Sequence, residues 1–222
     1  SHTEIADFTG LSSATISAIT ADLEKGEVIE KSEQQAASGR GRPRVQFRQR
    51  RDSGYLIVVI ISSDGVQYSL VDYAGTLIDR FGEDRSHDPD GAARFADAVG
   101  EGLERLLERS RLSRDKIKLI SISSKGLVSS DDAVLLWSPI FGSDRIDFEA
   151  ALRPAWQAKI ILDNETLLVA AALGAREDAG NPEGLRSLAA LSLGHSIGLG
   201  IVRNAGPAER EISAPNFGHM LH

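Results

Sequence analysis

The first chemistry that the sequence offers is phosphate binding by a short arginine-rich segment. Six arginines and no acidic residue lie between Gln34 and Arg51. Three of them alternate with glycine or proline: Arg40, Arg42 and Arg44. Guanidinium groups on such a loop suit contacts with phosphates and entry into a narrow minor groove, and they form planar, bidentate contacts that lysine cannot form. The segment is therefore either a DNA-contacting loop or a solvated, flexible linker.

The residues before this loop predict two short helices. Apolar residues recur at three- and four-residue intervals, as a helix requires: Ile5, Phe8 and Leu11, then Ile16, Ile19 and Leu23. Gly10 is typical of a left-handed residue that ends a helix, and Ser12 or Ser13 offers an N-cap for the next one. Two helices joined by a tight turn form either a helix-turn-helix, whose second helix binds in the major groove, or an ordinary helical hairpin.

Small residues at the start of the second predicted helix would let it approach bases and phosphates closely. We expect five of them to contact DNA: Ser12, Ser13, Ala14, Thr15 and Ser17. Gly26 ends this helix, and residues 27–32 and 45–49 predict two strands of a hairpin that flank the arginine loop. Helix, hairpin and basic loop together predict a winged helix-turn-helix over residues 1–51, with double-stranded operator DNA as its partner. The usual first helix of such a domain is missing here, so we expect the N-terminus to be incomplete.

Charge is distributed unevenly along the chain. Residues 1–51 contain eight Lys/Arg and seven Asp/Glu, whereas residues 52–222 contain 17 and 25, a net charge of −8. This asymmetry fits one nucleic-acid-facing domain attached to an acidic one. No apolar run approaches the roughly 18 residues that a membrane span needs, and no signal peptide is visible, so we expect a cytoplasmic protein. The absence of cysteine excludes disulfides and thiolate metal sites.

From Asp52 onward the pattern predicts an α/β domain with a mixed sheet over residues 52–222. Three strands separated by short turns predict an antiparallel meander: 55–61, 66–71 and 76–81. The remaining predicted strands are 117–122, 160–162, 188–193 and 197–202. Apolar spacing predicts helices over 90–109, 148–152 and 166–176.

This ordering resembles the ROK family, which comprises repressors and sugar kinases. Several segments carry the resemblance: Thr9–Ser12 and Gly41–Pro43 to the repressors' DNA-binding segment, Leu70–Gly75 to a strand and turn, Ser138–Pro139 to a Ser/Val-Pro-Asn loop, Asp163–Glu165 to Glu-Asn-Asp, Leu193–Val202 to a glycine-rich ligand loop, and Phe217–His219 to Glu-x-Gly-His. The resemblance implies an actin-like, ribonuclease-H-like ATPase-type α/β lobe behind the winged helix-turn-helix. It also implies a second lobe, which we expect to be incomplete in this sequence.

The chain departs from the family's kinases at two positions that the resemblance makes catalytic. Where they hold ATP phosphates on an Asp-x-Gly-Gly-Thr turn, this sequence has Ile61–Gly65, with one glycine and no threonine. Glu165 takes the place of their catalytic aspartate, and a base displaced by about 1 Å loses on the order of a hundredfold in rate. We therefore expect no enzymatic activity and no cofactor.

The same resemblance suggests ligand-binding residues. These are Asn164, Glu165, Asn216 and His219. Asn164 and Glu165 alternatively form a helix cap with a first-turn acid. The polar positions of the family's Pro-Asn and Glu-x-Gly-His motifs are Ile140 and Asn216 here, which indicates a changed ligand or none. His219 would be a zinc ligand, but its cysteine partners are lacking, so we expect no metal site.

These observations predict a DNA-binding transcriptional regulator, a repressor, whose degenerate sugar-kinase-like domain senses a small molecule such as a sugar. Helix-turn-helix proteins usually read paired half-sites, so we expect a homodimer or a dimer of dimers. Two alternatives stay open: an ATP-dependent sugar kinase, and a regulator whose second domain binds no ligand and serves only assembly.

Overall fold

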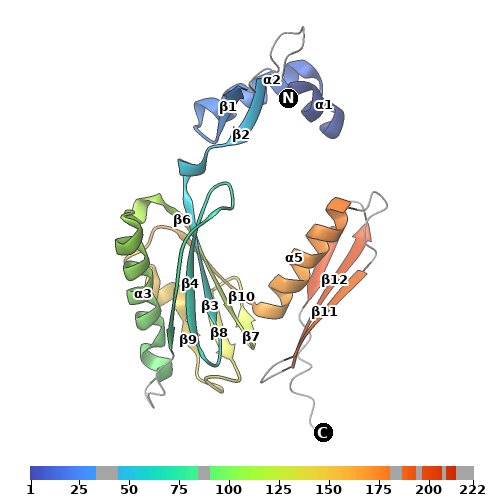
Figure 1. Cartoon of the computed structure of the whole chain (residues 1–222). Helices are drawn as coiled ribbons and strands as arrows, with labels where there is room; N and C mark the ends of the chain where they lie inside the picture. The colour runs from blue at the N-terminus through green and yellow to red at the C-terminus, as the bar shows by residue number, and fades with distance from the viewer. Residues whose placement is uncertain (34–44, 85–90, 181–186, 194–196, 207–208, 214–222) are drawn as a thin grey trace. The chain divides into compact units, whose positions relative to one another are not determined.

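The computed structural model describes residues 1–33, 45–84, 91–180, 187–193, 197–206 and 209–213. The chain forms two compact units (Figure 1). The first comprises Ser1–Tyr55 and Val71–Thr76, and the second comprises Leu56–Leu70 and Leu77–His222. The chain therefore passes from one unit to the other at three points instead of one. No helix among the described residues is long and apolar enough to cross a membrane.

The first unit contains two helices followed by an antiparallel hairpin. Its elements are α1 (His2–Thr9), α2 (Ser13–Lys25), β1 (Ile29–Glu33), β2 (Val45–Gln49) and the 3-10 helix η1 (Arg51–Ser53). As the sequence predicts, Gly10 adopts a left-handed conformation, with φ of 70°, and donates its N–H to the carbonyl of Ala6 over 2.8 Å. In the hairpin, Ile29 pairs with Gln49 and Glu33 with Val45.

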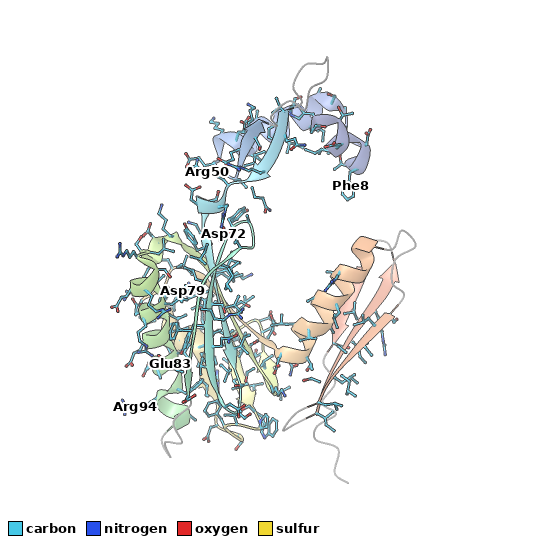
Figure 2. All side chains as sticks on the ribbon, in the orientation of Figure 1. Phe8, Arg50, Asp72, Asp79, Glu83 and Arg94 are labelled. Atoms are coloured by element: carbon cyan, nitrogen blue, oxygen red, sulfur yellow. The ribbon has the colours of Figure 1, made fainter. Side chains whose placement is uncertain are left out.

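A small core joins α2 to the hairpin. Ile16 and Thr20 are buried on one side of α2. The Thr20 hydroxyl donates to the Ile16 carbonyl over 2.8 Å and lies 2.9 Å from Nε2 of His2, whose ring packs against Phe47 of β2 at 4.9 Å between centroids. Phe8, by contrast, is 92% exposed on α1 (Figure 2). Helical spacing of apolar residues therefore predicted the helix correctly, but these residues are not all buried.

A five-stranded sheet forms the centre of the second unit, in the order β10-β6-β3-β4-β5. Its strands are β3 (Tyr55–Ile61), β4 (Gly65–Asp72), β5 (Leu77–Asp84), β6 (Ile117–Ser124) and β10 (Lys159–Asn164). β10 and β6 are parallel, and Asn164 pairs with Ser124. β3, β4 and β5 are joined by short turns, so they run antiparallel. This confirms the predicted α/β domain with a mixed sheet.

Helix α3 (Gly91–Ser110) packs along β5 and runs in the opposite direction. Two ion pairs fix this direction: Arg109 with Asp79 at 2.8 Å and Arg105 with Glu83 at 2.7 Å. The apolar face of α3 is buried, with Val99, Leu103, Leu106 and Leu107 at 4% exposure or less. The end of α3 therefore lies beside the first residues of β5, and its start lies beyond the last ones (Figure 1).

The sequence did not predict four of the strands described next: β7, β8, β9 and β13. After β6 a small sheet forms from β7 (Leu127–Ser129), β8 (Val134–Trp137) and β9 (Ile146–Asp147), followed by the short helix α4 (Phe148–Leu152). The helix α5 (Glu165–Gly180) packs against the antiparallel strands β11 (Ser187–Leu193), β12 (Ile197–Gly206) and β13 (Glu209–Ser213). Strands of two to five residues contain too few alternations to be distinguished from loops by pattern alone.

Candidate functional sites

The first candidate site is the start of α2. Ser12 is its N-cap: the hydroxyl accepts the N–H of Thr15 over 3.2 Å and lies 2.8 Å from the Thr15 hydroxyl. All five residues that the sequence predicts to contact DNA are exposed here: Ser12, Ser13, Ala14, Thr15 and Ser17. Small exposed side chains at a helix N-terminus allow close approach, and the positive end of the helix dipole favours an anionic partner.

The hairpin supplies few unpaired charges to this site. Lys31 pairs with Glu24 at 2.8 Å, and Arg48 pairs with Glu30 at 2.7 Å. The positive charge that could contact a phosphate must therefore come mainly from the residues that connect β1 and β2. Arg40, Arg42 and Arg44 belong to that connection and lie outside the described residues.

A charged junction follows β2. Arg50 pairs with Glu27 at 3.1 Å and with Asp52 at 2.9 Å, and these carboxylates raise its pKa further (Figure 2). The Ser53 hydroxyl donates to the carbonyl of Glu27 over 2.5 Å. These contacts tie the turn that ends α2 to the 3-10 helix η1.

Asp72, at the end of β4 and within the first unit, is the most buried charged side chain among the described residues of that unit, at 2% exposure. Its Oδ2 accepts a hydrogen bond from Nε of Arg51 over 2.5 Å, and its Oδ1 accepts the N–H groups of Ala74 and Thr76. Burial acts to raise the pKa of Asp72, but these hydrogen bonds outweigh it and hold the pKa below its usual range. The sequence places Asp72 in the Leu70–Gly75 strand and turn but does not predict its buried ion pair, although an Asp before a Tyr-Ala-Gly turn is a recognisable signal.

The second candidate site lies at the carboxyl ends of the parallel strands β6 and β10, the edge where α/β sheets usually bind ligands. The side chain of Asn164 is largely occupied there. Its oxygen accepts the N–H and hydroxyl of Thr166 at 2.9 and 2.6 Å, and its nitrogen donates to the Gly126 carbonyl over 2.8 Å. Asn164 thus begins α5 and holds the turn between β6 and β7, and its second amide hydrogen has no partner among the described residues, so it is available to a ligand.

Glu165 occupies the first turn of α5 and is half-buried. Beside it, β12 approaches the helix closely. A Cβ at Gly198 would lie 2.8 Å from the Thr166 side chain, and a Cβ at Gly200 would lie 2.1 Å from the Thr166 carbonyl. These glycines are therefore required for packing, whatever ligand the segment binds. Asn216 and His219 lie outside the described residues, so their predicted ligand contacts stay predictions.

The turn between β3 and β4 uses its own hydrogen-bonding groups. Ser62 donates its N–H to the carbonyl of Gly65 over 2.9 Å, and its hydroxyl accepts the N–H of Gly65 over 3.2 Å. The hydroxyl of Ser63 lies 3.2 Å from the carboxylate of Asp64. A turn closed in this way, with an acidic side chain on it, is poorly suited to hold a phosphate.

The turn after β8 is closed as well. Ser138 is fully buried, and its hydroxyl accepts the N–H groups of Ile140 and Phe141 at 3.3 and 3.0 Å. Ile140 thus occupies the tip of a compact turn with no polar side chain to offer. Among the described residues, no group of three His, Asp or Glu side chains could hold a metal ion.

The ROK family profile matches residues 66–222. The chain belongs to the ROK family. The matched residues include the sheet strands from β4 onward and the candidate ligand edge, and the match gives the second unit the actin-like fold of the ROK sugar kinases. No curated protein matches this ROK sequence.

Solved structures share the fold at low sequence identity. A ROK family transcriptional regulator, a homolog of the E. coli MLC protein, is 22% identical over 91% of this chain and 50% of its own, with a TM-score of 0.66. A ROK family glucokinase from Streptomyces griseus, in complex with glucose and AMPPNP, is 19% identical over 74% and 48%, with a TM-score of 0.54. A glucokinase from Balamuthia mandrillaris, in complex with glucose, is 16% identical over 75% and 48%, with a TM-score of 0.54. The chain spans about half the length of these ROK-type structures.

Proposed function

We propose that this ROK family member is a cytoplasmic, DNA-binding transcriptional regulator, a repressor controlled by a small molecule. The observation that carries the proposal is the sequence of elements in the first unit. Two helices meet at the left-handed Gly10, the second helix presents exposed small residues at its start, and an antiparallel hairpin follows. A hairpin whose connection contains Arg40, Arg42 and Arg44 is the wing of a winged helix-turn-helix.

In this proposal α2 lies in the major groove, and the arginines of the wing contact phosphates and the minor groove. Ser12–Thr15 and Ser17 contact bases and the sugar-phosphate backbone. The buried face of α2, with Ile16 and Thr20, is held against the hairpin, so helix and wing are presented together. The regulator works as a homodimer or a dimer of dimers on paired half-sites.

The second unit, in our proposal, binds a ligand and does not catalyse phosphoryl transfer. Two features support this. In the β3–β4 turn the N–H groups of Ser62 and Gly65 are bonded within the turn and Asp64 adds a negative charge, so the turn offers little to ATP phosphates. Glu165 replaces the aspartate that the family's kinases use as base. The two glucokinases of similar fold share only 19% and 16% sequence identity with this chain. Their similarity therefore supports the fold and not a shared activity.

The proposed effector is a sugar or a sugar derivative, bound at the carboxyl edge of β6 and β10. Glu165 and the free amide hydrogen of Asn164 would contact it, together with Asn216 and His219. Two solved structures of similar fold are complexes with glucose, which is the reason to begin with hexoses. Effector control requires that the ligand bind one state of the regulator more tightly than the other.

Salt-dependent DNA binding tests the proposal. Arg42→Ala should weaken binding to duplex DNA, and the slope of log K against log salt should become shallower by about one unit. Arg176→Ala, an exposed residue of α5, is the matched control and should leave the slope unchanged. An unchanged slope for Arg42→Ala would remove the wing from DNA recognition.

A further inference from the structure

A patch of basic residues lies on the otherwise acidic second unit. Residues 111–118 contain four basic residues and one acidic one, although residues 52–222 as a whole have a net charge of −8. We name this patch the basic edge. Its members are Arg111, Arg114, Lys116, Lys118 and Lys159. All five are exposed.

Two contacts bring the members of the basic edge together. The guanidinium of Arg114 lies 5.6 Å from the ring centroid of Trp156, which places residues 111–118 beside the segment that leads into β10. β10 then starts at Lys159, which pairs with Leu119 of β6, next to Lys118. Neighbouring strands lie about 4.8 Å apart and side chains alternate between the two faces, so Lys118 and Lys159 lie at the start of adjacent strands, on opposite faces of the sheet end.

Most of this charge is not neutralised within the chain. In the part of the chain that the structure describes, no ion pair holds Arg111, Lys116 or Lys159, and Lys118 contacts only the Asp115 carbonyl, at 3.4 Å. Arg114 does pair with Glu104, at 2.8 Å. Asp115 has its pKa lowered by a hydrogen bond from Ser113 and further by Lys116 and Lys118, so it offsets one of these charges. Three to four positive charges are left to face solvent.

The position of the basic edge in the fold suggests its partner. Because Arg109 pairs with Asp79 and Arg105 with Glu83, α3 ends beside the start of β5. β5 starts at Leu77, directly after the turn Val71–Thr76, which belongs to the first unit. Residues 111–118 follow α3, so the basic edge lies at the edge of the sheet from which the chain continues into the first unit. Figure 2 shows the same order along the sheet, from Asp79 to Glu83 and on to Arg94 at the far end.

We propose that the basic edge is a second DNA-contacting surface, which binds backbone phosphates beyond those that the winged helix-turn-helix contacts. This inference rests on the proposed function, because it assumes that the first unit brings DNA to the protein. Exposed lysines bind phosphates as mobile point charges, without reading the base sequence. The surface therefore adds affinity and salt dependence to every DNA sequence alike.

A triple variant tests this inference: Lys116→Gln, Lys118→Gln and Lys159→Gln. These residues are exposed, so the fold is kept, and Arg114 stays in place on Trp156. On a mixed-sequence duplex of 40 base pairs, each lost phosphate contact removes about 0.9 from the slope of log K against log salt. The expected slope is shallower by about two to three units, with weaker binding at low salt. Fluorescence anisotropy across a salt series measures both quantities.

The matched control removes the same number of charges elsewhere on the second unit: Arg94→Gln, Arg145→Gln and Arg176→Gln. Arg94 lies at the far end of α3 (Figure 2). This control should keep the wild-type slope. If both triple variants change the slope equally, or neither does, the basic edge is not a DNA-contacting surface. If the wild-type protein binds no duplex at all, the proposed function itself fails. If the wild type binds and the triple variant keeps its slope, only the inference about the basic edge fails.

Discussion

The Nε atom of Arg51 donates a hydrogen bond to Oδ2 of Asp72 over 2.5 Å, although 21 positions separate the two residues in the sequence. The backbone adds a second link, since the N–H of Tyr73 donates to the Arg51 carbonyl over 3.3 Å. Asp72 ends β4, a strand that lies mostly in the second unit, whereas the turn Val71–Thr76 belongs to the first. The pair therefore holds this turn against the segment that follows the hairpin.

Arg51→Met should destabilise the first unit, and the effect should depend on pH. In the wild type the pKa of Asp72 is below its usual value, so its carboxylate stabilises the fold above about pH 4, and this contribution is lost as the pH falls through the folded-state pKa. Without Arg51, burial of Asp72 is no longer opposed as strongly, its pKa rises, and stability is lost at a higher pH. Urea unfolding between about pH 2 and pH 8, followed by circular dichroism, measures the shift.

Arg48→Met is the control for this measurement, because it breaks an exposed ion pair with Glu30 in the neighbouring strand. Exposed pairs contribute little to stability, so its unfolding midpoint should stay near that of the wild type at every pH. Identical pH profiles for Arg48→Met and Arg51→Met would show that the Asp72 pair has no special role.

Two serines, the N-cap Ser12 and Ser17 of α2, should separate stability from DNA binding. Ser12→Ala removes the N-cap bond to the N–H of Thr15 and should cost about 1 kcal/mol of stability. Ser17→Ala removes an exposed hydroxyl, so stability should change by less than about 0.5 kcal/mol. Its DNA affinity should still fall by about two- to tenfold, the equivalent of roughly 0.5–1.5 kcal/mol for one hydrogen bond. Thermal unfolding and anisotropy on the same preparations check both, and a Ser17→Ala variant of unchanged affinity would argue against docking through this face.

Gly200→Ala should destabilise the packing of β12 on α5. A Cβ there would lie 2.1 Å from the carbonyl of Thr166 and 2.8 Å from Ala170, so the strand must shift, at a cost of about 1–3 kcal/mol. Gly82→Ala is the control, because its nearest neighbour would be the Val66 carbonyl at an ordinary 3.8 Å. Hydrogen exchange of residues 187–206 should rise in the first variant and not in the second. Equal protection in both would mean that β12 does not rest on α5 in solution.

Phosphoryl transfer should be absent. A coupled assay for ADP release, with ATP, magnesium and a panel of hexoses, should give the background rate for the wild type. Glu165→Asp should not raise this rate, because the N–H groups of Ser62 and Gly65 in the β3–β4 turn stay bonded within the turn. Hexose-dependent release of ADP would favour the sugar kinase alternative.

Sugars should nevertheless stabilise the protein if the second unit is a sensor. At about 100 times its dissociation constant, a ligand adds nearly 3 kcal/mol to the free energy of unfolding, which a thermal-shift panel detects readily. Glu165→Gln should reduce the shift, since Glu165 is half-buried beside the proposed site and is not the helix cap. A panel in which no sugar shifts the midpoint would favour a second unit that serves only assembly.

The sequence predicts the elements whose signals are local. Gly10 and Ser12 mark the turn between two helices, and β-branched runs mark β3 and β4. It does not predict the Arg51–Asp72 bond, because a contact across 21 positions depends on where β4 ends in the folded sheet. It also assigns Gly198 and Gly200 to a ligand loop, whereas their spacing to Thr166 gives them a packing role. The basic edge was missed for the same reason, since Lys159 joins residues 111–118 only through strand pairing.

The most direct test of the account is DNA selection with the purified protein. From a random duplex library at about 150 mM salt, we expect enrichment of a sequence with paired half-sites, and loss of this enrichment in Arg42→Ala. Native mass spectrometry of the selected complex should then show two or four chains per duplex. Absence of binding to any duplex, even at about 50 mM salt where phosphate contacts are strongest, would contradict the proposed function.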